Sequence, residues 1–300
     1  MADLWGPING IYTATVPWFP WATSLPSIDA GAWGSAMISA GFGAGVGAWM
    51  AGRIAKNAKL RDELLAELRS IDVATTLVIS VIDVVGSLKK QHVLALLSEY
   101  DSNLARFAEY KATAKRETPF KLTINNLRLQ AIAPPIADLQ ELVLKEMNIS
   151  PNGVKSMTAL ADAVANLNGM IGAHTALLEM FRSGGLPAGF APEHYYLGEP
   201  VGGVVNNEYG SAVRAIAVYT DDVIFFAYKL SECLTVRGFK ARDRYKKISG
   251  EKRTVRQIAT FGESAGLIPP DSAYEAWMKG WEKDSSDVVQ TRRWWQRKQK

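Results

Sequence analysis

The chain has 300 residues, of which 48% are hydrophobic and 21% are charged, so it can form a sizeable core and is not intrinsically disordered. Its formal net charge is only +4, but residues 1–52 contain no Lys or Arg, and all 34 basic residues follow them. The single cysteine, Cys233, cannot form an intrachain disulfide, which excludes a disulfide-stapled secreted domain. The composition therefore indicates two physically different parts that join near Arg53.

Residues 1–29 form a Trp- and Pro-rich stretch with four prolines and three tryptophans. A cleaved signal peptide needs a basic segment before its apolar run, and these residues have none. We therefore expect an irregular lead without regular secondary structure.

Residues 30–52 are the predicted transmembrane helix, because these 23 residues carry no charge. A helix of this length rises about 34 Å, which is enough to cross a hydrocarbon core of roughly 30 Å. Basic residues follow at once, namely Arg53, Lys56, Lys59 and Arg61. Since Lys and Arg favour the cytoplasmic flank of a span, the sequence predicts a single-pass membrane protein with its N-terminus outside and its C-terminal domain in the cytoplasm.

The predicted span is rich in glycine and alanine, and small residues recur in it at a spacing of four. This pattern lets membrane helices approach closely, and a span with few large apolar residues gains stability from neighbouring helices. We therefore expect a homo-oligomer whose helices pack through Gly41, Gly43, Gly45 and Gly47. The alternative interpretation is a flexible, partly buried helix of a soluble protein.

Residues 53–285 are expected to form a helical cytoplasmic domain, which begins with a long stalk-like helix. The most apolar run of the chain, Val73 to Leu88, lies in this helix and contains one charge, Asp83. At 16 residues the run is short for a membrane span, so a buried core helix is favoured. A second span, with Asp83 as a functional carboxylate inside the membrane, is the alternative.

The rest of the chain predicts an all-α fold, arranged as a multi-helix bundle. Residues 53 to about 115 are expected to form one very long helix, or two helices if the chain breaks near Gly86, and a long Gly- and Pro-rich surface loop is expected over 184–205. Alternating apolar residues around Asn125-Asn126 indicate one short β-hairpin near 120–132. Further helices are expected at about 135–147, 154–181, 208–236, 252–264 and from Ser272 onward.

Motifs with known chemistry are missing from the sequence. It has no phosphate-binding glycine loop, no nucleophile elbow and no His or Cys spacing typical of a metal site, so we predict no catalytic residue, no cofactor and no metal. The adjacent carboxylates Asp221 and Asp222 point about 100° apart on a helix, which disfavours an acid–base pair. Cys233 is interpreted as a small buried residue rather than a nucleophile.

Two basic segments are the best candidates for contact with lipid or another polyanion. Nine Lys or Arg lie between Arg237 and Arg256, and the basic tail 286–300 mixes cations with tryptophans. Such clusters attract anionic lipids, whereas nucleic acid is a less favoured partner and a merely solubilising surface is the plain alternative. The candidate contacts are Arg242, Arg244, Lys246, Lys247, Arg292, Arg293, Trp294 and Trp295.

The sequence therefore predicts a membrane-anchored, non-enzymatic helical protein that acts as a scaffold, sensor or assembly partner. A membrane-perturbing effector or pore-forming oligomer would use the same glycine pattern. An enzyme whose site is assembled only in the fold is the third hypothesis. The small-molecule ligand, if one exists, is not predicted.

Overall fold

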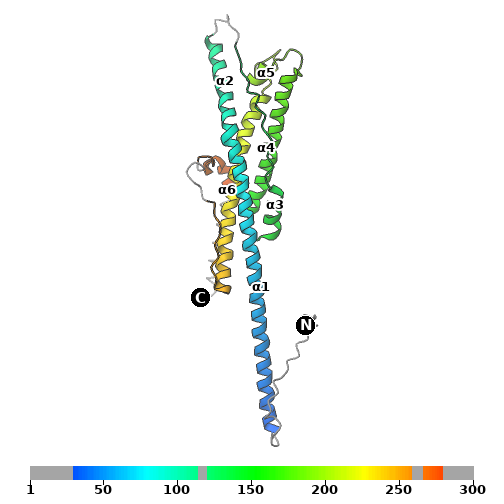
Figure 1. Ribbon diagram of the computed structural model, residues 1–300, viewed down its shortest axis with the longest axis vertical. Coiled ribbons are helices and arrows are strands. Elements are labelled where there is room, and N and C mark those ends of the chain that lie inside the picture. Colours follow the sequence, from blue (N-terminus) through cyan, green and yellow to red (C-terminus); the bar gives the residue numbers. More distant parts are fainter. Residues whose placement is uncertain (1–29, 114–119, 259–265, 280–300) are drawn as a thin grey trace, which may run out of the picture. The chain divides into compact units, whose positions relative to one another are not determined.

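The computed structural model describes residues 30–113, 120–258 and 266–279, and these residues are mostly helical with no strand among them (Figure 1). The predicted all-α class is therefore confirmed. The chain divides into two compact units, residues 1–59 and residues 60–300. In chain order the elements are α1 (Ala30–Leu88), the π-helical turn η2 (Lys89–Val93), α2 (Leu94–Thr113), α3 (Ile136–Glu141), the π-helical turn η3 (Leu142–Glu146), α4 (Pro151–Ser183), α5 (Pro192–Leu197), α6 (Glu208–Ser249) and the 3₁₀ turn η4 (Asp271–Tyr274).

The first unit contains the N-terminal part of α1, and its described side chains are exposed from Ala48 to Lys59. Large apolar residues are among them: Trp49 is 61% exposed, Met50 52% and Ile54 68%. The Arg53 guanidinium lies 5.5 Å from the centre of the Trp49 ring. This part of α1 therefore presents apolar surface that the described protein atoms leave uncovered.

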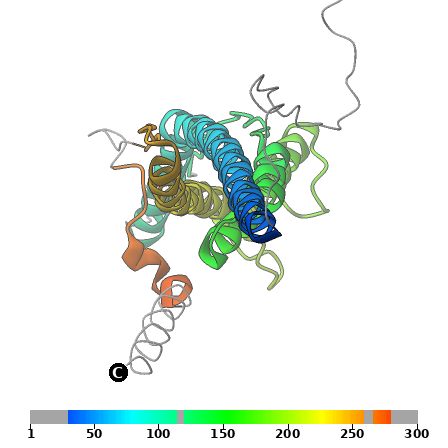
Figure 2. The same ribbon diagram turned by 90° about the horizontal axis from the view of Figure 1, so that it is seen from below.

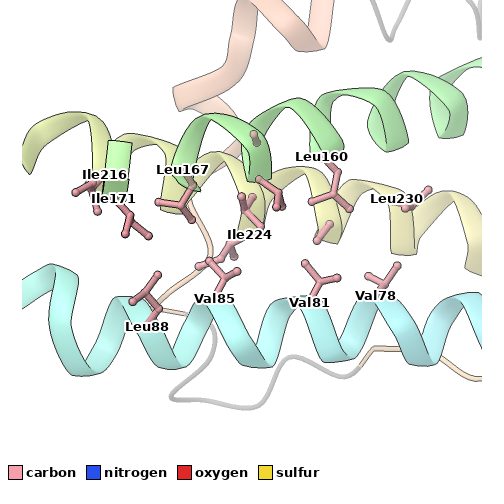
Figure 3. Packing of buried hydrophobic residues seen from close by; sticks show 14 of the residues in the cluster. Val78, Val81, Val85, Leu88, Leu160, Leu167, Ile171, Ile216, Ile224 and Leu230 are labelled. Atoms are coloured by element: carbon pink, nitrogen blue, oxygen red, sulfur yellow. The ribbon is translucent and has the colours of Figure 1, made fainter. Parts of the chain in front are cut away.

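The second unit is built around one face of α1. Val78, Val81 and Val85 are fully buried, and they point toward side chains of α4 and α6 (Figure 3). Each buried Val contributes about 1.5–3 kcal/mol of hydrophobic stabilisation. The partners include Leu160, Leu167 and Ile171 of α4 and Ile216, Ile224 and Leu230 of α6.

One face of the run from Val73 to Leu88 is therefore buried in the second unit. The continuous helix over Ala48–Thr113 nevertheless contains an 18-residue window with a mean hydropathy of 1.9, of which 44% is buried, and it is the one described helix that is long and apolar enough to span a membrane. Val73 and Val84, on the outer side of α1, are 50% and 41% exposed. The run is thus half covered by protein.

The predicted break near Gly86 is a π-helical turn, η2, rather than an interruption of the helix. Lys89 at its start forms an ion pair with Asp221 of α6, with 2.6 Å between Nζ and Oδ1. The same ammonium donates to the Leu267 carbonyl at 2.9 Å. The turn therefore carries a half-buried cation that joins three segments of the chain.

The predicted β-hairpin near 120–132 is wrong, because the described residues 120–135 are irregular and do not pair as strands. Side chains from helices satisfy their backbone groups instead. Asn168 of α4 bonds both backbone groups of Ile132, accepting from its N–H at 2.9 Å and donating to its carbonyl at 2.8 Å. Alternation of apolar residues here reflects an extended segment lying against helices.

Two other expectations also fail in part. Residues 252–258 are not helical, and the remainder of the predicted 252–264 helix lies outside the described residues. The expected surface loop 184–205 contains α5, whose Tyr195 and Tyr196 are buried. His194 caps the start of this helix, since its Nδ1 accepts the Ala191 N–H at 2.8 Å.

Helix ends elsewhere follow local signals. Ser150 caps α4 by accepting the Gly153 N–H at 3.3 Å, and Pro151 occupies the first turn, so this helix begins three residues before its predicted start. Gly184, with φ of 67°, ends it in the left-handed conformation. The last described residues, 266–279, lie beside α6 (Figure 2).

An aromatic cluster at one end of the bundle encloses His174 of α4, which is fully buried. Its ring lies 5.3 Å from that of Tyr209, and Tyr209 in turn stacks on Tyr196 at 4.5 Å. Neither ring nitrogen of His174 has a hydrogen-bond partner among the described residues. Burial therefore lowers the pKa of His174 to about 4.

His174 makes stability depend on pH. The neutral ring is favoured in the fold, so the stabilisation is complete above the unfolded pKa of 6.5 and is lost as pH falls toward about 4. The loss is about 1.4 kcal/mol per pH unit, or about 3 kcal/mol in all. Urea unfolding of His174→Phe between these pH values is expected to show a shallower fall than the wild type. The control, His92→Phe at a half-exposed position, keeps the wild-type slope, and equal slopes in all three chains contradict the assignment.

Candidate functional site

The residues singled out from the sequence fall into separate regions. Gly41, Gly43, Gly45 and Gly47 lie in the first unit, within α1. Arg242, Arg244, Lys246 and Lys247 lie on the last turns of α6, in the second unit. Arg292, Arg293, Trp294 and Trp295 lie outside the described residues, as do the predicted lead and tail.

The C-terminal end of α6 is an exposed basic surface. Arg244, Lys246 and Lys247 are exposed, and no acidic side chain in the described ranges forms an ion pair with them. Arg242 differs, because it pairs with Asp243 at 2.8 Å and lies 4.7 Å from the Phe239 ring. Three of the four predicted α6 cations are therefore directed to solvent.

This basic end lies beside the residues with which α1 enters the second unit. The Arg237 Nε donates to Glu67 Oε1 at 2.6 Å, and both side chains are largely buried. A Cβ on Gly238 would lie 3.5 Å from Ile71, which shows how closely α6 approaches α1. Glu67 and Ile71 of α1 therefore lie at the same end of the second unit as the α6 cations.

A cavity of about 810 Å³, which we call the polar cavity, opens where α4 begins. Its walls come from the loop before α4 and from α6, and they include both charged and amide side chains. Among its lining residues are Asn148, Asn152, Cys233, Arg237 and Lys240. Lys240 is exposed and has no acidic partner within the described part of the chain.

A second cavity of about 520 Å³, which we call the isoleucine cavity, lies between α1, α6 and the C-terminal segment. Its apolar walls are half-buried or buried, and its polar residues lie at the exposed rim. The apolar lining residues are Ile79, Ile82, Ile224, Ile258, Leu267 and Ile268, and the rim includes Asp83, Ser87, Lys90 and Gln91. Gly86 also lines it, and a Cβ there would meet only Leu267, at 4.0 Å.

The two cavities adjoin, since both are lined by Tyr228, Gln257 and Ile258. Both volumes lie in the range of small-molecule sites. Two cavities therefore lie next to each other along α6, one with a polar lining and the other with an apolar lining.

The outer wall of the isoleucine cavity is held by contacts from residues 266–279. Tyr274 stacks on Phe225 with ring centres 3.7 Å apart, and its hydroxyl donates to Asp222 at 2.7 Å. Lys229 binds Asp271 at 2.9 Å, and Lys155 lies 4.5 Å from the Trp277 ring. These contacts fix Leu267 and Ile268 over the cavity.

The adjacent carboxylates Asp221 and Asp222 contact different partners. Asp221 is engaged by Lys89 and Asp222 by Tyr274, so each serves as an anchor. Burial raises the pKa of Asp222, although the hydrogen bond from Tyr274 opposes this shift. Among the described residues, no three His, Cys, Asp or Glu side chains are placed to hold a metal ion.

The cavities and the aromatic cluster were not found from the sequence. The walls of the isoleucine cavity combine α1 and α6 with Gln257, Ile258, Leu267 and Ile268, and this combination depends on tertiary packing rather than on spacing in the sequence. The isolated charges Asp83 and Lys90 beside an apolar run were the available signal, and they mark the cavity rim.

Comparison with protein-family models, curated proteins and solved structures gave no match at any level of similarity that carries an argument.

Cys233 is expected to react slowly with thiol reagents. Burial raises the pKa of its thiol, and the hydrogen bond with Ser150 offsets this only in part, so little thiolate forms at neutral pH. Alkylation by N-ethylmaleimide should be about tenfold slower in the folded chain than in urea. Ser150→Ala should slow it further by removing the opposing effect. Equal rates in the folded and unfolded chains contradict this account of Cys233.

Proposed function

We propose that this chain is a membrane-anchored, non-enzymatic helical protein whose second unit acts as a scaffold, sensor or assembly partner. The exposed apolar surface of α1 carries the proposal. Trp49 and Met50, near the end of the uncharged segment 30–52, and Ile54, just after it, are not covered by the residues that the structure describes. Exposed contiguous apolar surface is costly in water and marks contact with a membrane or a partner.

Charge supports an orientation as well as an anchor. The cations that follow the uncharged segment begin at Arg53, and the further cations of α6 lie at the end of the second unit that α1 enters. This distribution favours a single pass with the second unit in the cytoplasm. Self-association through Gly41, Gly43, Gly45 and Gly47 belongs to the same proposal, because small residues at this spacing allow close helix packing.

Membrane anchoring is tested by placing charges in the uncharged segment. The full chain is expected in the membrane fraction after alkaline extraction, and Phe42→Arg with Val46→Arg is expected to move it to the soluble fraction. Each central Arg disfavours insertion by about 3 kcal/mol, which a weakly apolar span cannot offset. The matched control is Val204→Arg with Val205→Arg, at two exposed positions of the second unit. A wild-type chain that is soluble without detergent refutes the anchor.

We also propose that the exposed α6 cations contact anionic lipid. Each basic residue near such a surface contributes about 1 kcal/mol, so an anionic bilayer should stabilise the second unit more than a neutral one.

Charge reversal separates this contact from a solubilising surface. In phosphatidylglycerol nanodiscs, Lys246→Glu with Lys247→Glu should remove about 2 kcal/mol of the stabilisation seen relative to phosphatidylcholine nanodiscs. Lys121→Glu with Lys145→Glu, at exposed positions elsewhere in the unit, serves as the control. The readout is the urea unfolding midpoint in each lipid. If both pairs lower the difference equally, α6 has no special contact with lipid.

A further inference from the structure

The polar cavity and the isoleucine cavity together have the chemistry of an amphiphile site. The isoleucine cavity presents six apolar side chains, none of them exposed, while the cations and amides of the polar cavity lie beyond Tyr228, Gln257 and Ile258. A ligand that spans both needs an apolar chain joined to a polar head.

The charged residues that line the polar cavity indicate whether the ligand's polar head group is anionic or cationic. Glu232 lines it but is paired with Lys229 at 3.2 Å, and Arg237 is paired with Glu67. Lys240 is left as the uncompensated charge among the described lining residues. The amides of Asn148 and Asn152, at the same cavity, can donate to oxygen atoms.

The space beside Gly86 allows the apolar chain of a ligand to lie against α1. A side chain at this position would extend into the isoleucine cavity, where only Leu267 comes within 4.0 Å of an added Cβ. Glycine in a helix interior costs about 1 kcal/mol relative to alanine, so an open cavity rather than helix stability accounts for it.

We propose that the adjoining cavities bind a single-chain anionic amphiphile, with its acyl chain in the isoleucine cavity and its head beside Lys240. A fatty-acid anion and a lysophospholipid share this chemistry. The proposal concerns the second unit alone and is independent of the membrane anchor.

Cys233 gives a site-specific readout, because it is the only cysteine of the chain and lines the polar cavity. The full chain is alkylated with N-ethylmaleimide at about pH 8.5, where a free thiol is about half ionised. It is held in phosphatidylcholine nanodiscs, or in plain buffer if the chain proves soluble, so failure of the anchor leaves this test intact. Dodecanoate at about ten times its dissociation constant should slow alkylation roughly tenfold.

Two variants test the two halves of the site. Gly86→Leu fills the isoleucine cavity and should abolish protection, so that its alkylation rate with dodecanoate equals its own rate without dodecanoate. Gly172→Leu is the matched control, since it adds the same side chain at an exposed helical glycine with open space around it. Lys240→Glu should weaken protection by dodecanoate but not by uncharged dodecanol.

Two further probes test the charge of the head group and whether the ligand is a free fatty acid or a lipid. Dodecyltrimethylammonium should protect less than dodecanoate, and a comparison with lysophosphatidylglycerol of equal chain length distinguishes a free fatty acid from a lipid. Protection by either anionic probe that is lost in Gly86→Leu supports the proposal. Absent protection, protection that survives Gly86→Leu, or equal protection by the cationic probe overturns it.

Discussion

Burial of one face of α1 against α4 and α6 is the contact on which the second unit depends. Val78, Val81 and Val85 occur at helical spacing and are fully buried, so α1 is held in one rotation about its axis. That rotation places Ile79 and Ile82 in the isoleucine cavity and leaves Val84 on the outer side. The same contact thus determines both the core and the position of the candidate site.

Polar contacts then fix segments that the core alone does not order. Lys89 joins the π-helical turn to α6 and to the Leu267 carbonyl, and Asn168 satisfies both backbone groups of Ile132. A buried backbone group without a partner is costly, so such bonds replace strand pairing where the chain is extended. Side-chain hydrogen bonds and an ion pair therefore hold the non-helical segments in place against the helices.

The sequence predicted the long helices α4 and α6, but it did not predict α5 or the irregular residues 252–258. Helical spacing of apolar residues predicted α4 and α6, because one face of each is buried along its length. The alternating apolar residues around Asn125-Asn126 wrongly predicted a β-hairpin, since a segment that lies against a helix surface can have the same period of two as a strand. The cavities escaped prediction because their walls combine residues far apart in sequence, such as Ile82, Ile224 and Ile268.

The docked segment 266–279 has a kinetic consequence for the isoleucine cavity. Its attachment combines the Tyr274 stack and the Lys229–Asp271 ion pair with packing of Ile268 against the core. Segments held in this way open locally at a lower free energy than global unfolding requires. For the amphiphile proposed above, we therefore expect exit from the cavity to follow local detachment of this wall rather than unfolding of the second unit.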